Sequence, residues 1–183
     1  MEESNERPTL LKHAIKWGLI LGGVSIVLSI LFYAIDYRLM VLFKTLLISL
    51  AIYLGVTIYS GIDYRKSIGG FIPFGKAFQH AFLVLAISAL VATVYNFVLY
   101  NVIDTELPKK LTEASMDNAR EMMQNFGAPE DKIEEELAKT EERTAGQFTV
   151  SGQLMGYGVI LIFSAIMALI SGAIVKKNEP VDF

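Results

Sequence analysis

The order of apolar and polar positions divides the chain into four long apolar stretches separated by polar segments. Each stretch is long enough to cross about 30 Å of hydrocarbon as a helix, for which about 20 residues suffice. The charged side chains within the stretches are only Lys16 and Lys44. The pattern predicts an all-α polytopic membrane protein, a single membrane domain over 1–183 with four transmembrane helices. These helices are expected at 14–35, 39–62, 77–103 and 150–175.

The polar segment 104–149, between the third and fourth stretches, has its own helical pattern. It holds 12 acidic and 6 basic residues. Gly127 interrupts the segment, and Pro129 with Glu130 and Asp131 is typical of a helix start. The segment is therefore predicted to be an acidic extramembrane helical hairpin. Its apolar positions recur at three- to four-residue steps, as on one helical face: Leu107, Leu111, Ala119, Met122 and Phe126, then Ile133 and Leu137.

Two shorter connections join the first three apolar stretches. Residues 36–38 leave so little chain that the first two helices must be antiparallel neighbours. Residues 63–76 read DYRKSIGGFIPFGK, a basic turn in which three glycines and a proline interrupt helix. Because its aromatic side chains favour the headgroup level, we expect an interfacial loop there.

Composition and charge exclude several classes of function. The chain has 183 residues, is 53% hydrophobic and contains no cysteine, which excludes disulfide scaffolds, thiol catalysis and thiolate zinc sites. His13 and His80 lie too far apart in sequence for a helical metal-binding pair. A net charge of -3 offers no basic surface for nucleic acid. We expect no cofactor, no metal, no nucleic acid partner and, without a visible catalytic constellation, no enzymatic activity.

The basic residues give a prediction of orientation through their placement. Counted by side, the two sets of loops carry eight lysines and arginines each. One set lies in short segments beside the apolar stretches, whereas most of the other lies in 104–149 among twice as many acidic residues. Charges close to the membrane count most in the positive-inside rule. We therefore expect both termini in the cytoplasm and 104–149 in the periplasm. The first stretch exceeds a signal-peptide core of about 7–15 residues, so it is expected to stay in the mature protein.

Small residues at four-residue steps mark two apolar stretches as helix-packing candidates. Small side chains let two helix backbones approach closely inside a membrane. The motifs fit packing within one chain or homodimerisation, and we favour packing within one chain. The candidates are Gly18 and Gly22 in the first stretch and Gly152, Gly156, Ala168 and Gly172 in the fourth.

Several polar side chains interrupt the apolar stretches. Thr93 and Asn96 lie on one stripe and fit either a polar substrate path or interhelical hydrogen bonds, of which we favour the second. Lys44 is an intramembrane charge near a helix end, and snorkelling to the headgroups is the favoured interpretation. His80 fits a proton relay or, as we favour, a structural role.

Residues 65–83, RKSIGGFIPFGKAFQHAFL, carry a resemblance to a known family. The chain resembles domain of unknown function 4199, a family of four-helix bacterial membrane proteins found mainly in Bacteroidota. The resemblance rests on G-G-F-I-x-F-G-x-A-F at Gly69 to Phe78, on a following apolar stretch ending Y-N-V-I-D at Asp104, and on an acidic insert before a last apolar stretch. It implies a four-helix membrane protein and supplies no activity, cofactor or catalytic residue.

The functional hypothesis that follows is a non-enzymatic structural or accessory subunit of the bacterial inner membrane. Its partners would be the lipid bilayer and another membrane protein or a second copy of itself. Met122, Met123 and Phe126 are the candidate docking residues, because they place flexible apolar side chains on a charged module. The alternatives are a subunit of an oligomeric small transporter or channel, and an intramembrane enzyme.

Overall fold

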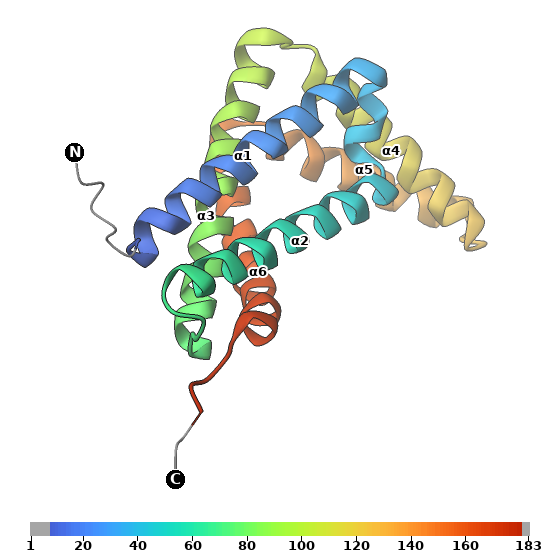
Figure 1. The fold of residues 1–183 in the computed structure, drawn as a ribbon. Coiled ribbons are helices and arrows are strands. Elements are labelled where there is room, and N and C mark those ends of the chain that lie inside the picture. Colours follow the sequence, from blue (N-terminus) through green and yellow to red (C-terminus); the bar gives the residue numbers. More distant parts are fainter. Residues whose placement is uncertain (1–7, 181–183) are drawn as a thin grey trace. The chain divides into compact units, whose positions relative to one another are not determined.

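Residues 8–180 are described by a computed structural model, in which every named element is a helix (Figure 1). The predicted location of the termini concerns residues 1–7 and 181–183, which lie outside the described residues. The elements are α1 (Leu10–Ile35), a 3-10 helix (Tyr37–Val41), α2 (Phe43–Ser67), α3 (Phe74–Val98), a π-helical segment (Leu99–Ile103), α4 (Leu107–Asn125), α5 (Glu130–Gln147) and α6 (Val150–Val175).

Four of these helices are long and apolar enough to cross a membrane. They are α1, α2, α6 and the continuous helical stretch formed by α3 with the π-helical segment. The shortest has 25 residues and is therefore about 38 Å long. The prediction of an all-α polytopic membrane protein with four spanning helices is confirmed.

Apolar and polar side chains are distributed as expected for lipid-facing helices. Large apolar side chains point outward along all four spanning helices, among them Leu19, Leu46, Leu90 and Phe163. Buried positions hold many small polar side chains, because lipid imposes no cost on exposed apolar groups whereas polar groups in hydrocarbon need protein partners. The buried polar side chains of the spanning helices are His13, Ser25, Thr45, Thr57, Ser60, His80, Ser88, Ser164 and Ser171.

The chain forms two compact units, and each spanning helix contributes to both. The first unit comprises residues 8–25, 50–91 and 159–180. Within it, α1 and α3 approach closely at Gly18 and Gly22, where an added Cβ would lie 2.7 Å from Cβ of Ile87 and 2.8 Å from Cβ of Val91. Buried Ala14, Leu21, Val84 and Leu85 form the cluster beside this contact.

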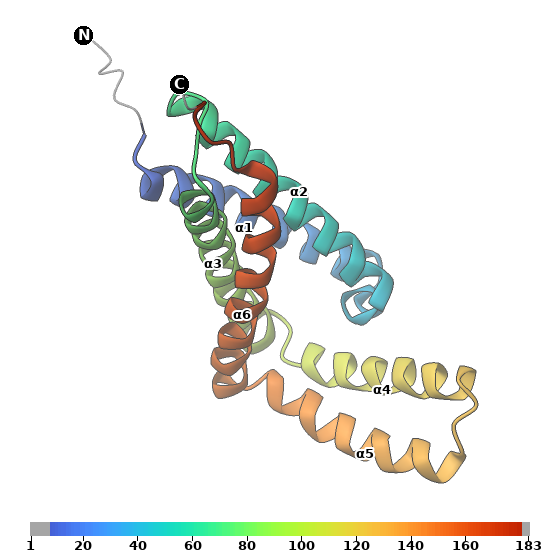
Figure 2. The ribbon, with the colours of Figure 1, turned by 90° about the horizontal axis from the view of Figure 1, so that it is seen from below.

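The connection between α2 and α3 lies at one end of the first unit (Figure 2). Helix α2 continues to Ser67, so the predicted loop over 63–76 is shortened to residues 68–73. Gly69 and Gly70 end the helix with φ values of 111° and 90°, which other L-residues rarely adopt. Ile72 then forms an antiparallel bridge with Lys177, in which each backbone N–H donates to the other residue's carbonyl at 2.8 and 2.9 Å.

The additional turn of α2 is stabilised by contacts of its own polar side chains. Arg65 Nη1 donates to the carbonyl oxygen of Val175 at 2.7 Å, at the end of α6. Tyr64 is buried with Ile72, Ala77 and Val175. Ser67 Oγ donates within the helix to the carbonyl oxygen of Tyr64 at 2.7 Å. Residues 63–67 are therefore helical despite their polar character, with Arg65 bonded to a neighbouring segment and Tyr64 packed against it.

The second unit comprises residues 26–49 and 92–158 and contains the predicted helical hairpin, which is confirmed. Helices α4 and α5 lie side by side in both views (Figures 1 and 2). Of the predicted apolar positions, Leu107, Leu111, Ile133 and Leu137 are buried, whereas Met122 and Phe126 are exposed. Gly127 makes the turn with a φ of 73°.

Candidate functional site

Three ionisable side chains from three helices form a hydrogen-bonded chain within the first unit. His13 of α1 lies between the other two, with its Nδ1 2.9 Å from Nε2 of His80 on α3. Its Nε2 lies 3.2 Å from Oδ2 of Asp63 on α2. Both distances are within the range of N–H···N and N–H···O hydrogen bonds. The three residues are called the Asp–His–His cluster below.

Two aromatic side chains hold the cluster in place. Trp17 Nε1 donates to the same Oδ2 of Asp63 at 3.2 Å. The Tyr64 ring stacks on His80 with the planes 3° apart and the centroids separated by 5.0 Å. The Asp63 carboxylate and the His80 ring are thus each fixed by a second contact, so the orientation of both ends of the cluster is determined by the fold.

Burial increases along the cluster from one end to the other. The Asp63 side chain is 46% exposed, the His13 side chain 7%, and His80 is fully buried. His80 Nδ1 is also buried and has no hydrogen-bond partner within the part of the chain that the structure describes. A carboxylate open to the surroundings is therefore connected through one imidazole to a second imidazole whose remaining nitrogen faces the protein interior.

The hydrogen-bonding pattern of this arrangement is suited to proton exchange. Among the described residues, no group of three or more histidine, cysteine, aspartate or glutamate side chains could hold a metal ion. His13 uses both ring nitrogens within the cluster, so neither has a free lone pair directed elsewhere. A series of groups that both donate and accept hydrogen bonds is the arrangement along which protons move.

The sequence identified His80 but missed its two partners. The sequence predicts a loop at Asp63, and the spacing of His13 and His80 excludes only a helical metal-binding pair. The signal that could have found them is the alternation of the spans, which places the start of α1, the end of α2 and the start of α3 at the same end. All three residues lie within about 9 Å of that end along their helices.

The other intramembrane polar candidates lie in the second unit. Lys44 is exposed near the start of α2. Thr93 and Asn96 lie half-buried on α3. The structure brings none of the three into the Asp–His–His cluster.

The small-residue candidates have different surroundings. Gly18 and Gly22 face α3, and an added Cβ at Gly172 would lie 3.1 Å from the backbone nitrogen of Phe78. Ala168 is fully buried. An added Cβ at Gly152 would meet the carbonyl oxygen of Gly146, in the last turn of α5, whereas at Gly156 it would meet nothing within 4 Å.

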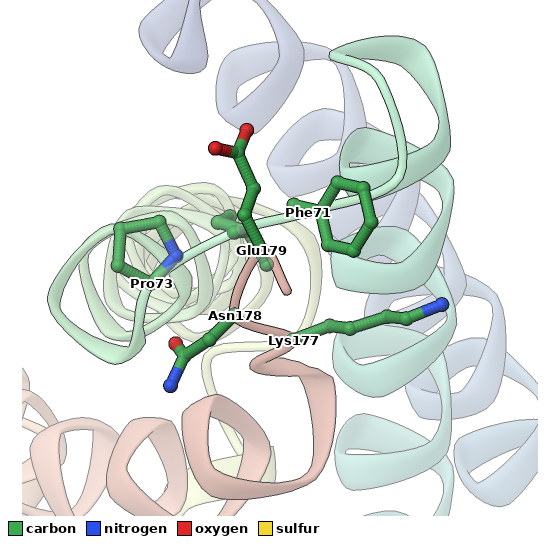
Figure 3. A pocket seen from close by; sticks show the side chains of 6 residues that line it. Phe71, Pro73, Lys177, Asn178 and Glu179 are labelled. Carbon is green, nitrogen blue, oxygen red and sulfur yellow. The ribbon is translucent and has the colours of Figure 1, made fainter. Parts of the chain in front are cut away.

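A hollow lies beside the bridge between Ile72 and Lys177, away from the cluster (Figure 3). Its lining combines Phe71, Ile72 and Pro73 with Lys177, Asn178 and Glu179. The Lys177 ammonium lies 5.3 Å from the centroid of the Phe71 ring, within cation–π range. The hollow therefore lies between residues 71–73 of the loop and residues 177–179 after α6. None of the cluster residues lines it.

The candidate docking residues lie at the turn of the hairpin. Phe126 is 84% exposed and Met122 is 58% exposed, while Met123 is half-buried. Arg120 on α4 and Glu130 on α5 form an ion pair of 2.9 Å near the same turn. An exposed aromatic ring thus stands at the tip of a module whose other exposed side chains are mostly charged.

Asp104, which follows the third spanning stretch, accepts a hydrogen bond from Tyr33 Oη at 2.9 Å. This bond holds the pKa of Asp104 below its usual value, and Lys110 Nζ at 3.6 Å acts in the same direction. Because the pKa is lower in the folded state, the stabilisation is present above the unfolded pKa. It is lost as pH falls through the folded pKa.

We expect Tyr33→Phe to raise the pKa of Asp104 toward its usual value, because the phenylalanine ring fills the same space without a donor. The measurement is an acid titration of the aspartate carboxyl carbons by NMR, with Tyr95→Phe as the control on a neighbouring helix. An unchanged Asp104 titration in the Tyr33→Phe protein would contradict the assignment of this contact as the main cause.

Comparison with known proteins matches the chain to a family model. A family model covers residues 16–177, and the family is described as a protein of unknown function (DUF4199). The matched range includes Asp63 and His80 and begins shortly after His13. No curated protein and no solved structure matches the chain.

Proposed function

The chain belongs to the DUF4199 family, whose description states no activity, and from its geometry we propose that it is a non-enzymatic accessory subunit of the bacterial inner membrane. In this proposal four spanning helices anchor an acidic helical hairpin that contacts a second, different membrane protein. The observation that supports it is the exposed Phe126 ring beside Met122 at the hairpin tip.

The chemistry of the partner surface follows from the hairpin itself. Aromatic and methionine side chains are enriched at the buried centres of protein interfaces. Residues 104–149 carry a net charge of -6, from 12 acidic and 6 basic residues. The complementary partner surface is therefore an apolar pocket with a basic rim, on a protein that lies next to this one in the membrane.

A photocrosslinking amino acid at position 126 tests the proposal in native membranes. We expect a discrete adduct with one membrane protein, and mass spectrometry should place the crosslinked peptide beside a segment of net positive charge. The matched control carries the same amino acid at Glu134, an exposed position on α5, and should give no such adduct. If the only adducts were with lipid, or had twice the mass of this chain as expected for a crosslinked homodimer, the proposal of a different membrane protein as the partner would be contradicted.

The proposed orientation places both termini in the cytoplasm and residues 104–149 in the periplasm. It is supported by Arg65, Lys66, Lys76, Lys176 and Lys177, which lie in or beside short connections at one end of the first unit. Positive charge beside spanning helices is characteristic of the cytoplasmic side.

Single cysteines can test this orientation directly, because the chain has none of its own. In intact cells with a permeable outer membrane, we expect a membrane-impermeant thiol reagent to label Lys139→Cys but not Asn178→Cys. After lysis both should react, since both positions are exposed. Labelling of Asn178→Cys in intact cells would reverse the proposed orientation.

A further inference from the structure

The hydrogen bonds of the Asp–His–His cluster determine which ring nitrogen carries each hydrogen. An ionised carboxylate only accepts hydrogen bonds, so His13 Nε2 must carry the hydrogen that it shares with Asp63. A neutral imidazole has one N–H, which leaves His13 Nδ1 as an acceptor. The 2.9 Å contact with His80 is therefore a bond donated by His80 Nε2.

The same hydrogen bonds determine the protonation of His80, the buried residue of the cluster. Because His80 Nε2 carries the hydrogen, His80 Nδ1 is a lone pair. It is buried and has no hydrogen-bond partner among the described residues. A basic nitrogen in the interior, oriented by an imidazole and a carboxylate behind it, is the arrangement that general bases have in proton-transfer sites.

We propose that Asp63, His13 and His80 form a proton relay, in which His80 Nδ1 is the inner proton acceptor and Asp63 is the outer exchange point. This inference goes beyond the accessory role and does not depend on it. When a proton binds His80 Nδ1, the Nε2 hydrogen of His80 passes to His13 Nδ1. The Nε2 hydrogen of His13 then passes to Oδ2 of Asp63, and Asp63 releases it to water.

The steps balance with hydronium as the proton donor to His80 Nδ1 and water as the proton acceptor from Asp63. One N–H bond forms and one breaks on each imidazole, and one O–H bond forms and breaks on Asp63. One proton enters at His80 and one leaves at Asp63, and the series runs equally in reverse. Both rings end as Nδ1–H tautomers. They return to the Nε2–H tautomers by ring rotation or when a proton passes in the reverse direction. Proton transfer changes no oxidation state, and the series therefore needs no oxidant or reductant.

The surroundings of the cluster favour this use. Asp63 is 46% exposed, which gives the outer end access to exchangeable protons, whereas His80 is fully buried. Trp17 donates to Asp63 without offering a proton acceptor, so the carboxylate exchanges protons with His13 alone within the cluster. The charged groups acting on the two rings are Asp63 of α2 and Lys16 of α1, with Tyr64 stacked on His80. Arg65, also on α2, is directed to the end of α6 instead.

The first test uses the wild-type protein, because His13 and His80 are its only histidines. The protein is labelled with ¹⁵N-histidine and reconstituted in vesicles of phosphatidylethanolamine and phosphatidylglycerol. At about pH 8 we expect both rings as Nε2–H tautomers, with a scalar coupling across the bond from His80 to His13. A hydrogen on His80 Nδ1, or the absence of this coupling, would overturn the proposal.

The second test separates proton transfer from packing. Asp63→Asn retains an oxygen that accepts from His13 and Trp17, so a purely structural cluster would behave as before. The amide cannot take up and release the proton, and we expect exchange of the His80 Nε2 hydrogen with water to slow by about tenfold or more. Asp104→Asn, which alters a carboxylate paired with Tyr33 in the second unit, is the matched control and should leave that exchange rate unchanged. Equal exchange rates in wild type and Asp63→Asn would overturn the relay.

Discussion

Replacing Gly22 by valine is expected to destabilise the protein by about 1–3 kcal/mol, the cost of overpacking a close contact. A Cβ at this position would lie 2.8 Å from both Cβ and Cγ1 of Val91, closer than two carbon atoms approach without displacement. Val91 is β-branched and has little rotamer freedom with which to move aside. Helices α1 and α3 must therefore separate locally at this point of the first unit.

Gly23→Val is the matched control for this prediction. Gly23 is the next residue of the same helix, and an added Cβ there would meet nothing within 4 Å. The two variants share the same intrinsic helix propensity, so the difference between them isolates the contact with α3. The free energy of unfolding in lipid micelles is the measurement. Equal values for the two variants would show that the close approach of α1 and α3 does not contribute to stability.

The four spanning helices could be predicted from sequence because the bilayer leaves the backbone few alternatives. Every backbone N–H and C=O in hydrocarbon must be satisfied within the chain, so long apolar runs must be helices. The hairpin was predictable for a local reason, since Gly127 and Pro129 mark the turn between two helical patterns. Neither prediction required knowledge of which helices pack together.

The end of α2 could not be predicted in the same way. Residues 63–67 are mostly polar, so hydropathy predicts a loop there, yet they are helical. Their helical state depends on partners far away in the sequence: Asp63 on His13 and Trp17, and Arg65 on Val175. Hydropathy reports whether a residue favours lipid, but not whether a distant helix offers a hydrogen bond.

The Asp–His–His cluster could be predicted only in part from the sequence, for a related reason. Alternation of the spans determines that His13, Asp63 and His80 lie at one end, which the sequence shows. Whether they meet depends on the rotation of each helix about its axis. That rotation is set by contacts such as Gly18 against Ile87, where small and β-branched side chains interlock. Those pairings are not encoded in the periodicity of either helix alone.

The second large effect is expected for the two histidines, because removing one leaves the other without its partner. His80→Leu removes the hydrogen donor to His13 Nδ1 within a buried site. Leaving a buried polar group unsatisfied costs about 1–3 kcal/mol. His13→Leu is expected to cost a similar amount, since it leaves His80 Nε2 unpaired and removes one donor to Asp63.

The double variant His13→Leu/His80→Leu is expected to be less destabilised than the sum of the single variants, by about 0.5–3 kcal/mol. Once one histidine is gone, removing the second takes away an unsatisfied group instead of creating one, and leucine fills the space with a side chain that needs no partner. The measurement is a double-mutant cycle of unfolding free energies. His80→Leu combined with Gly23→Ala, ten residues and about 15 Å along α1 from His13, supplies the control and should be additive. Additivity of the two histidine substitutions would mean that their hydrogen bond contributes nothing to the fold, and the buried end of the cluster would then lack the contact on which its orientation depends.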